Sequence, residues 1–224
     1  MELKSKPVFH EFFVREHNRA DYRFARAILK YKPDFVFLEM GNSNGNPDTI
    51  FNHYDPWKKP TNKVKAIQNK MGKNAKTFGY AKSDILMWDN IMKLWREDHN
   101  TLVFNTDAPN DLRREFFEVW KNMYPSAKKN WLWWVQIYLR EKYMERNIRW
   151  ALRKYNFKKY PIALVQFGGF HWRHIKFLLS NPSKKEIWNY YFKKFPEISP
   201  KNIAQKIRKE NKLFYKYWKT MSGF

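Results

Sequence analysis

Short apolar runs alternate with longer stretches of helical periodicity along this chain. Four runs, residues 7–11, 35–39, 101–107 and 162–171, carry little alternation of polar and apolar positions. Such runs are typical of strands buried on both faces of a parallel sheet. Their separation by helical patterns predicts an α/β fold with a mostly parallel central sheet flanked by helices, ending in a helical C-terminal extension.

Apolar residues at helical spacing predict the connecting elements. The predicted helices cover residues 18–31, 62–71, 83–98, 111–123, 127–155, 184–195 and 201–221. Residues 41–60 are rich in Gly, Asn and Pro, which indicates a lid or binding loop. We expect an α/β domain over residues 1–180, with residues 181–224 packed on it as a basic, aromatic helical extension.

Composition narrows the class of protein. The chain of 224 residues has no Cys, which excludes disulfides and thiolate-bound metals, so any metal must use His, Asp or Glu. The N-terminus lacks the apolar segment of a secretory signal. The most apolar helical run, residues 131–139, is far shorter than the roughly 20 residues of a membrane span. We therefore expect a cytoplasmic protein without a membrane span.

The net charge of +23 suggests a polyanionic partner. Cations bind phosphates and flat rings stack on bases, so basic segments with interleaved aromatic residues favour nucleic-acid binding. The segment after Pro182 has this pattern, with Lys184, Lys185, Lys193, Lys194, Lys201, Lys206, Arg208 and Lys209 among Trp188, Tyr190, Tyr191 and Phe192. A lysine-rich solvated surface explains the charge equally well.

The candidate chemistry lies where the predicted strands end. Ligands of parallel sheets gather outside the carboxyl ends of the strands. The side chains delivered there are His10, Glu11, Glu39, Asp107 and His171. Glu39 ends so apolar a run that it needs a cation, a donor or water, because burial without a partner is costly. It suits a metal ligand, a general base or the partner of an arginine.

Histidines and one arginine extend this candidate set. Gly168 and Gly169 allow a tight turn before His171, and His174 follows at a spacing that puts both histidines on one helical face. Arg140 interrupts an apolar helical stripe, so it either pairs with a carboxylate or holds an anionic group. Alternatively, His171 is a hydrogen-bonded structural residue, and Arg140 forms an ion pair that only stabilises the fold.

The first predicted strand and the start of the helix after it hold two histidines, His10 and His17. His10, Glu11 and His17, converging with a histidine from another strand, suit a divalent metal that activates water. Alternatively, His17 is only a surface residue at the start of the next helix, and Asp107 only caps the helix that follows it.

Three segments resemble, in order, motifs of the TraB/Tiki proteins, relatives of the erythromycin-esterase and ChaN-like group. Residues 32–39, KPDFVFLE, resemble their segment of lysine, proline and aspartate that leads through apolar residues to a glutamate. Residues 138–144, YLREKYM, resemble their arginine-containing helix, and residues 168–171, GGFH, fit their second Gly-x-x-His motif. The resemblance covers about residues 7–179.

The first motif of that family is altered here. Family members have Gly-x-x-His or Gly-Glu-x-His after the first strand, whereas this chain has no glycine before His10. In the other register Phe13 takes the place of the histidine. His17 matches a further histidine of ChaN-like members. His10 and His17 are therefore alternative ligands. The altered motif also leaves open that the site has lost its catalytic activity.

The resemblance implies metal-dependent hydrolysis of a peptide or ester bond. A divalent Mn, Co or Zn ion would be bound from the set His10, His17, Glu39, His171 and His174. Glu11 would act as general base, and Arg140 would orient Glu39 or hold the substrate. The alternatives are a nucleic-acid-associated protein, either binding or nucleolytic, and a regulatory binding protein without catalysis.

Overall fold

The computed structural model describes residues 7–13, 22–39, 82–99, 101–123, 130–155 and 160–224. His17, the expected loop at residues 41–60 and the expected helix at residues 62–71 lie outside the described residues. The chain divides into two compact units. The first comprises Met1–Met40, Asn46–Asn105 and Trp150–Trp172, and the second comprises Gly41–Gly45, Thr106–Arg149 and Arg173–Phe224. The expected extension, residues 181–224, falls within the second unit.

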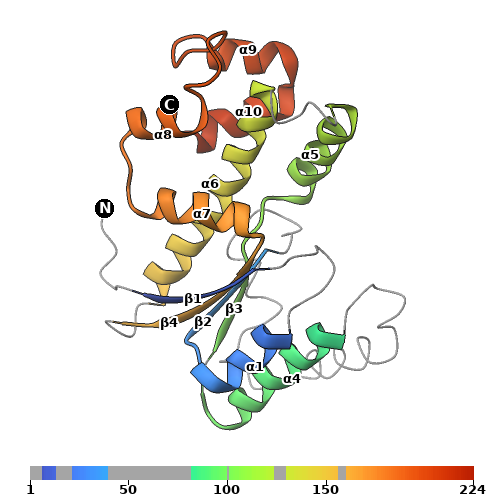
Figure 1. The fold of residues 1–224 in the computed structure, drawn as a ribbon, viewed down its shortest axis with the longest axis vertical. Helices are drawn as coiled ribbons and strands as arrows, with labels where there is room; N and C mark the ends of the chain where they lie inside the picture. The colour runs from blue at the N-terminus through green and yellow to red at the C-terminus, as the bar shows by residue number, and fades with distance from the viewer. Residues whose placement is uncertain (1–6, 14–21, 40–81, 100, 124–129, 156–159) are drawn as a thin grey trace. The chain divides into compact units, whose positions relative to one another are not determined.

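A sheet of four parallel strands forms the centre of the first unit (Figure 1). The strands are β1 (Val8–Phe13), β2 (Phe35–Leu38), β3 (Leu102–Asn105) and β4 (Ile162–Phe167). Their order is β1-β4-β2-β3, so the last strand in sequence lies between the first two. The prediction of an α/β fold with a parallel sheet is confirmed.

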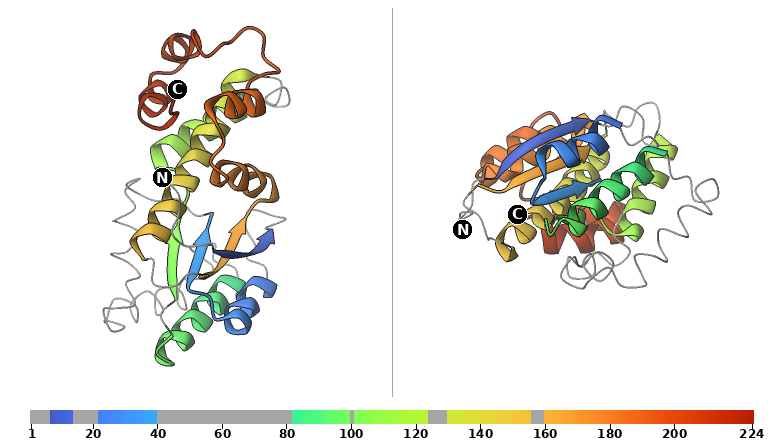
Figure 2. Two further views of the ribbon diagram at one scale, coloured as in Figure 1. Left: turned by 90° about the vertical axis from the view of Figure 1, so that its left-hand side faces the viewer. Right: turned by 90° about the horizontal axis from the view of Figure 1, so that it is seen from below.

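Apolar residues cover both faces of this sheet. Helices α1 (Tyr22–Tyr31) and α4 (Lys82–Arg96) pack on one face, where their apolar residues form a buried cluster with Val36, Leu38, Val103 and Leu164 (Figure 2). On the other face the rings of Phe35, Phe37 and Phe104 lie 5.4–6.1 Å apart. Burial on both faces explains why the strands read as continuous apolar runs.

Helices make up most of the described part of the second unit. They are α5 (Asn110–Met123), α6 (Trp131–Lys154) to Arg149, α7 (Gly169–Leu179) from Arg173, α8 (Lys184–Tyr191), α9 (Ile203–Glu210) and α10 (Lys212–Met221). Tyr138 of α6 packs against the rings of Tyr191 and Trp218, and its hydroxyl donates to the carbonyl of Ser222. No helix in the described ranges is long and apolar enough to cross a membrane.

The single helix expected over residues 201–221 is two helices. Asn211 separates them with an extended backbone, φ −153° and ψ 110°. Its side-chain oxygen accepts from the N–H of Phe214, which caps α10, and its amide donates to Glu115 of α5. Asparagine is a preferred N-cap because its side chain replaces a missing helical acceptor. The break therefore comes from a polar side chain inside an otherwise helical pattern.

Candidate functional site

Glu39 and His171 meet at the carboxyl end of the sheet in the first unit. Glu39 directly follows β2, and its N–H donates to the carbonyl of Gln166 in β4. His171 lies in the first turn of α7. His171 Nε2 is 3.9 Å from Glu39 Oε1, and the two side chains are 8% and 9% exposed. The sequence analysis predicted both residues at this edge, and the structure brings them together.

Backbone and packing interactions hold this pair in place. The N–H of Gly168 donates to Glu39 Oε2 over 2.6 Å, which leaves Oε1 as the oxygen nearer to His171. Trp172, the next residue of α7, packs against the rings of Phe9 and Phe167 and anchors the start of that helix. Both members of the pair are therefore held by neighbours on the sheet.

Gly168 permits close approach rather than a special turn. Among the described glycines only Gly223 has a positive φ, so the turn before α7 does not require a glycine for its backbone angle. A Cβ at Gly168 would stand 3.4 Å from Glu39 Oε2 and 3.8 Å from His171 Cδ2. The missing side chain leaves room for the carboxylate next to the backbone N–H.

His10 and Glu11 do not lie at the end of their strand, which corrects the sequence prediction. β1 continues to Phe13, and His10 pairs in register with Leu164, on the face that α1 and α4 cover. There the His10 ring stacks on Tyr31 of α1, with centroids 4.0 Å apart. Val36 and Leu38 of β2 face α1 and α4. Because side chains alternate along a strand, Glu39 lies on the other face of the sheet from His10. The structure therefore does not bring these two residues together.

Glu11 is an exposed residue of β1 that pairs in register with Val165. It stands two residues before the end of the strand, and its role as general base stays a prediction. His17, the other candidate of the first motif, lies outside the described residues.

Arg140 has a carboxylate partner within the second unit. Its Nε and Nη2 donate to Asp107 Oδ1 and Oδ2 over 2.7 and 2.6 Å, and Arg113 Nε lies 3.1 Å from Oδ2. Burial alone would raise the pKa of Asp107, but the Arg140 and Arg113 guanidiniums outweigh burial and hold that pKa below its ordinary value. Asp107 is therefore the anchor of a buried ion cluster, while the pairing of Arg140 with Glu39 stays a prediction.

His174 belongs to a second buried group, which the sequence analysis missed. Its Nδ1 lies 2.9 Å from both carboxylate oxygens of Glu141, and the Tyr191 hydroxyl donates to Oε2 of the same carboxylate over 2.7 Å. Burial and the nearby Glu141 charge raise the pKa of Tyr191 well above its ordinary value, which keeps the hydroxyl protonated as a donor.

The missed residue, Glu141, directly follows Arg140 on α6. Most of this helix is buried on all sides, so a charged residue on either face can become internal. A sequence reading that assigned one core-facing stripe to the helix could not find it.

The donor set for a metal ion is incomplete in the described residues. No group of three or more His, Asp or Glu side chains in that part of the chain is arranged to hold an ion. His171 and His174 have different carboxylate partners, Glu39 and Glu141. Within the described residues, Glu39 and His171 are the members of the expected ligand set that lie together, and the five-residue set stays a prediction.

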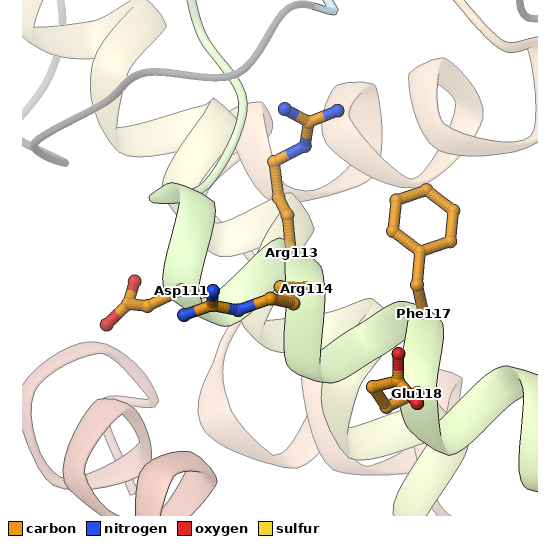
Figure 3. Close-up of a pocket in the computed structure, with 5 residues that line it drawn as sticks. All are labelled: Asp111, Arg113, Arg114, Phe117 and Glu118. Atoms are coloured by element: carbon orange, nitrogen blue, oxygen red, sulfur yellow. The ribbon is translucent and has the colours of Figure 1, made fainter.

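A shallow hollow of about 430 Å³ lies over α5 in the second unit (Figure 3). Five side chains of this helix line it, those of Asp111, Arg113, Arg114, Phe117 and Glu118. None of them was a predicted site residue. The ring of Phe117 is 53% exposed.

No protein-family model, curated protein or solved structure matches this chain. The resemblance to the TraB/Tiki proteins therefore stays a prediction based on its three motifs.

Proposed function

We propose that this protein is a hydrolase whose site is formed by Glu39 and His171. The observation that carries the proposal is the 3.9 Å separation of His171 Nε2 and Glu39 Oε1 at the carboxyl edge of a parallel sheet. This distance is too long for a direct hydrogen bond but suits one small atom that contacts both groups. A water molecule at that position would donate one hydrogen to each.

The chemistry follows from the two groups. Unprotonated His171 Nε2 removes a proton from the water, while Glu39 accepts the other hydrogen and orients the oxygen. The resulting hydroxide attacks the carbonyl carbon of an ester or peptide, and the histidine returns its proton to the leaving group. The choice of ester or peptide bonds rests on the family resemblance alone.

Phe170 supplies a surface for the substrate next to this pair. Its ring is 44% exposed and lies 5.5 Å from the His171 ring, in an edge-on arrangement. An exposed aromatic side chain beside a polar pair is suited to an apolar substrate group. We therefore favour substrates with an apolar group next to the scissile bond.

A divalent metal fits the pair in part. Tetrahedral zinc with bonds of about 2.0–2.2 Å holds two ligand atoms about 3.4 Å apart, so the 3.9 Å between His171 Nε2 and Glu39 Oε1 would have to shorten for both to bind one ion. When bound, the ion would activate water as a Lewis acid. A zinc site needs at least one more protein ligand, and the described residues do not supply it. The proposal therefore rests on the two side chains and not on a metal.

Glu39→Gln and His171→Ala test the proposal. Each should lower hydrolysis of nitrophenyl esters or fluorogenic peptides, assayed with and without added Mn²⁺ or Zn²⁺, by about 100-fold or more, the usual contribution of a general base. Glu97→Gln is the matched control, because Glu97 is an exposed carboxylate of the same unit that only pairs with Lys32 over 3.7 Å.

The outcomes separate the alternatives. Loss of activity in Glu39→Gln and His171→Ala but not in Glu97→Gln would support the proposed site. Activity that survives both substitutions would place the reaction elsewhere. An unmutated protein that hydrolyses none of these substrates under any metal condition would favour a regulatory binding protein.

A further inference from the structure

Several acidic side chains of the second unit are withdrawn from solvent or held by polar partners. Asp107, Glu141 and Glu145 are buried. Two acids on α5 also have polar partners, because Asp111 accepts from the Tyr217 hydroxyl and Glu115 accepts from the Asn211 amide. Residues 181–224 retain three exposed acids, Glu186, Glu197 and Glu210, and these are outnumbered by the exposed lysines and arginines of the same segment.

Three lysines form an exposed stripe along α10. Lys212, Lys216 and Lys219 follow the i, i+4, i+7 spacing of one helical face, a span of about 10 Å at 1.5 Å per residue. Within the described parts of the chain, none of them forms an ion pair. Lys216 lies over the ring of Tyr217 and Lys219 over that of Tyr215, at 5.7 and 5.9 Å. The stripe thus offers uncompensated cations at a spacing useful for successive phosphates.

The hollow on α5 offers a different chemistry. The exposed ring of Phe117 gives an apolar platform for stacking, and the Arg113 side chain extends to the same side of the helix (Figure 3). Glu118 adds an exposed carboxylate, which accepts hydrogen bonds from the amino groups of adenine or cytosine. This combination suits an unpaired nucleobase.

Side-chain contacts of Tyr217 connect the hollow with the lysine stripe. The Tyr217 hydroxyl is 2.8 Å from both carboxylate oxygens of Asp111, which lines the hollow. Lys216 lies over the ring of the same tyrosine. A base-sized aromatic platform and a row of cations are therefore neighbours within one unit.

We infer that α5 and α10 bind single-stranded nucleic acid. The phosphates lie along Lys212, Lys216 and Lys219, and one unstacked base lies on Phe117 in the hollow. This inference does not rest on the Glu39–His171 site, because its residues belong to the second unit only.

Two features argue against other polyanions. A helix that binds a lipid surface buries an apolar face in it, but the apolar residues of α10, Phe214, Tyr217, Trp218 and Met221, are already buried in the protein. In a nucleic-acid duplex the bases are stacked and paired, so they are not available to Phe117. A single strand is the polyanion that uses both the lysines and the ring.

Salt dependence tests the lysine stripe. Binding of a labelled single strand of about 20 nucleotides is followed by fluorescence anisotropy between about 50 and 200 mM salt. Each phosphate contact contributes about −0.7 to the slope of log affinity against log salt for a single strand. Replacing Lys212, Lys216 and Lys219 together by Gln should reduce the magnitude of this slope by about 2.

The matched control removes the same charge elsewhere in the unit. Lys184, Lys185 and Lys201 are exposed. Their replacement by Gln should change the slope of log affinity against log salt only slightly. An equal reduction of the slope in both triple variants would show that binding responds to net charge alone. That result would overturn the proposal that phosphates bind along Lys212, Lys216 and Lys219. Equally tight binding of phosphatidylserine vesicles by the unmutated protein would favour a membrane partner instead.

Phe117→Ala tests the base contact. Loss of one stacked base should weaken single-strand binding by about 5- to 150-fold and leave duplex binding nearly unchanged. Tyr22→Ala is the control, since Tyr22 is an aromatic residue of the first unit that is 49% exposed. Thermal unfolding confirms that each variant is folded. Equal affinity for duplex and single strand, with no effect of Phe117→Ala, would overturn the inference of a base site.

Discussion

One missing side chain controls the approach of Glu39 to the start of α7. A Cβ at Gly168 would meet Glu39 Oε2 at 3.4 Å, which is ordinary contact, whereas a larger side chain would occupy the carboxylate's place. We expect Gly168→Ala to change the unfolding free energy by less than about 1 kcal/mol. Gly168→Leu should cost about 1–3 kcal/mol, as overpacking does.

Denaturant unfolding of the two variants measures this difference. Hydrolysis by the two variants adds an independent readout, because only the leucine should displace Glu39 from His171. If alanine and leucine are equally well tolerated, Gly168 does not hold the carboxylate close to the backbone.

The carboxylate of Asp107 should make the second unit sensitive to acid. Its folded pKa lies below the ordinary value of 3.8, so its stabilising contribution is complete above that value. The contribution is lost as the pH falls through the folded pKa. Unfolding free energies measured from pH 6 downward should therefore decline more steeply in the unmutated protein than in Asp107→Asn.

The same substitution should be costly at neutral pH. Removing one charge of a buried pair leaves its partner uncompensated and costs about 3–5 kcal/mol. Glu186→Gln is the control for the acid effect. Hydrogen bonds from the Ser183 side chain and backbone lower the pKa of Glu186 too, but this residue is exposed, so its loss should matter little. Equal acid profiles for the unmutated protein and Asp107→Asn would contradict the buried cluster.

Among the elements, the junction of α9 and α10 depends on one asparagine. Asn211→Ala removes the acceptor for the Phe214 N–H and the donor to Glu115. We expect a loss of about 0.5–2 kcal/mol in unfolding free energy, the usual range for an N-cap. Asn211→Ser keeps a capping oxygen and should recover much of this loss. Serine and alanine variants of equal stability would show that the cap contributes nothing.

The elements themselves were largely predictable. The four strands were found because burial on both faces leaves a continuous apolar run, a signal contained in each segment. The break at Asn211 was missed because its side chain makes a long-range bond to Glu115 that no local pattern contains. The extent of β1 was missed because residues 12 and 13 continue the strand by pairing with β4.

The candidate site was predicted from the sequence in part. Glu39 and His171 were found because parallel strands place their carboxyl ends at one edge. His10 was misplaced because the strand was ended too early, and such an error moves a side chain along the sheet and can change its face. Glu141 could not be found because its burial depends on the packing of α6 against α7 and α8, which the sequence does not display.

At the scale of the whole molecule, basic residues are concentrated near the C-terminus, and the two proposed sites belong to different units. Residues 173–224 carry thirteen lysines and arginines against three glutamates. The proposed hydrolytic pair belongs to the first unit, and the proposed nucleic-acid face belongs to the second. Neither unit is a continuous stretch of chain, so the two proposals must be tested by substitutions in the full chain and not by truncation.

The strand order also has a consequence for synthesis on the ribosome. Within the described sheet β1 pairs only with β4, which is translated roughly 150 residues later. At about 5–20 residues per second, the nascent chain carries an unpaired β1 for roughly 8–30 seconds. Throughout that interval Phe9 lacks Trp172 of α7, the ring that later packs against it. The nascent N-terminal segment is therefore a natural target for chaperones that bind exposed apolar strands.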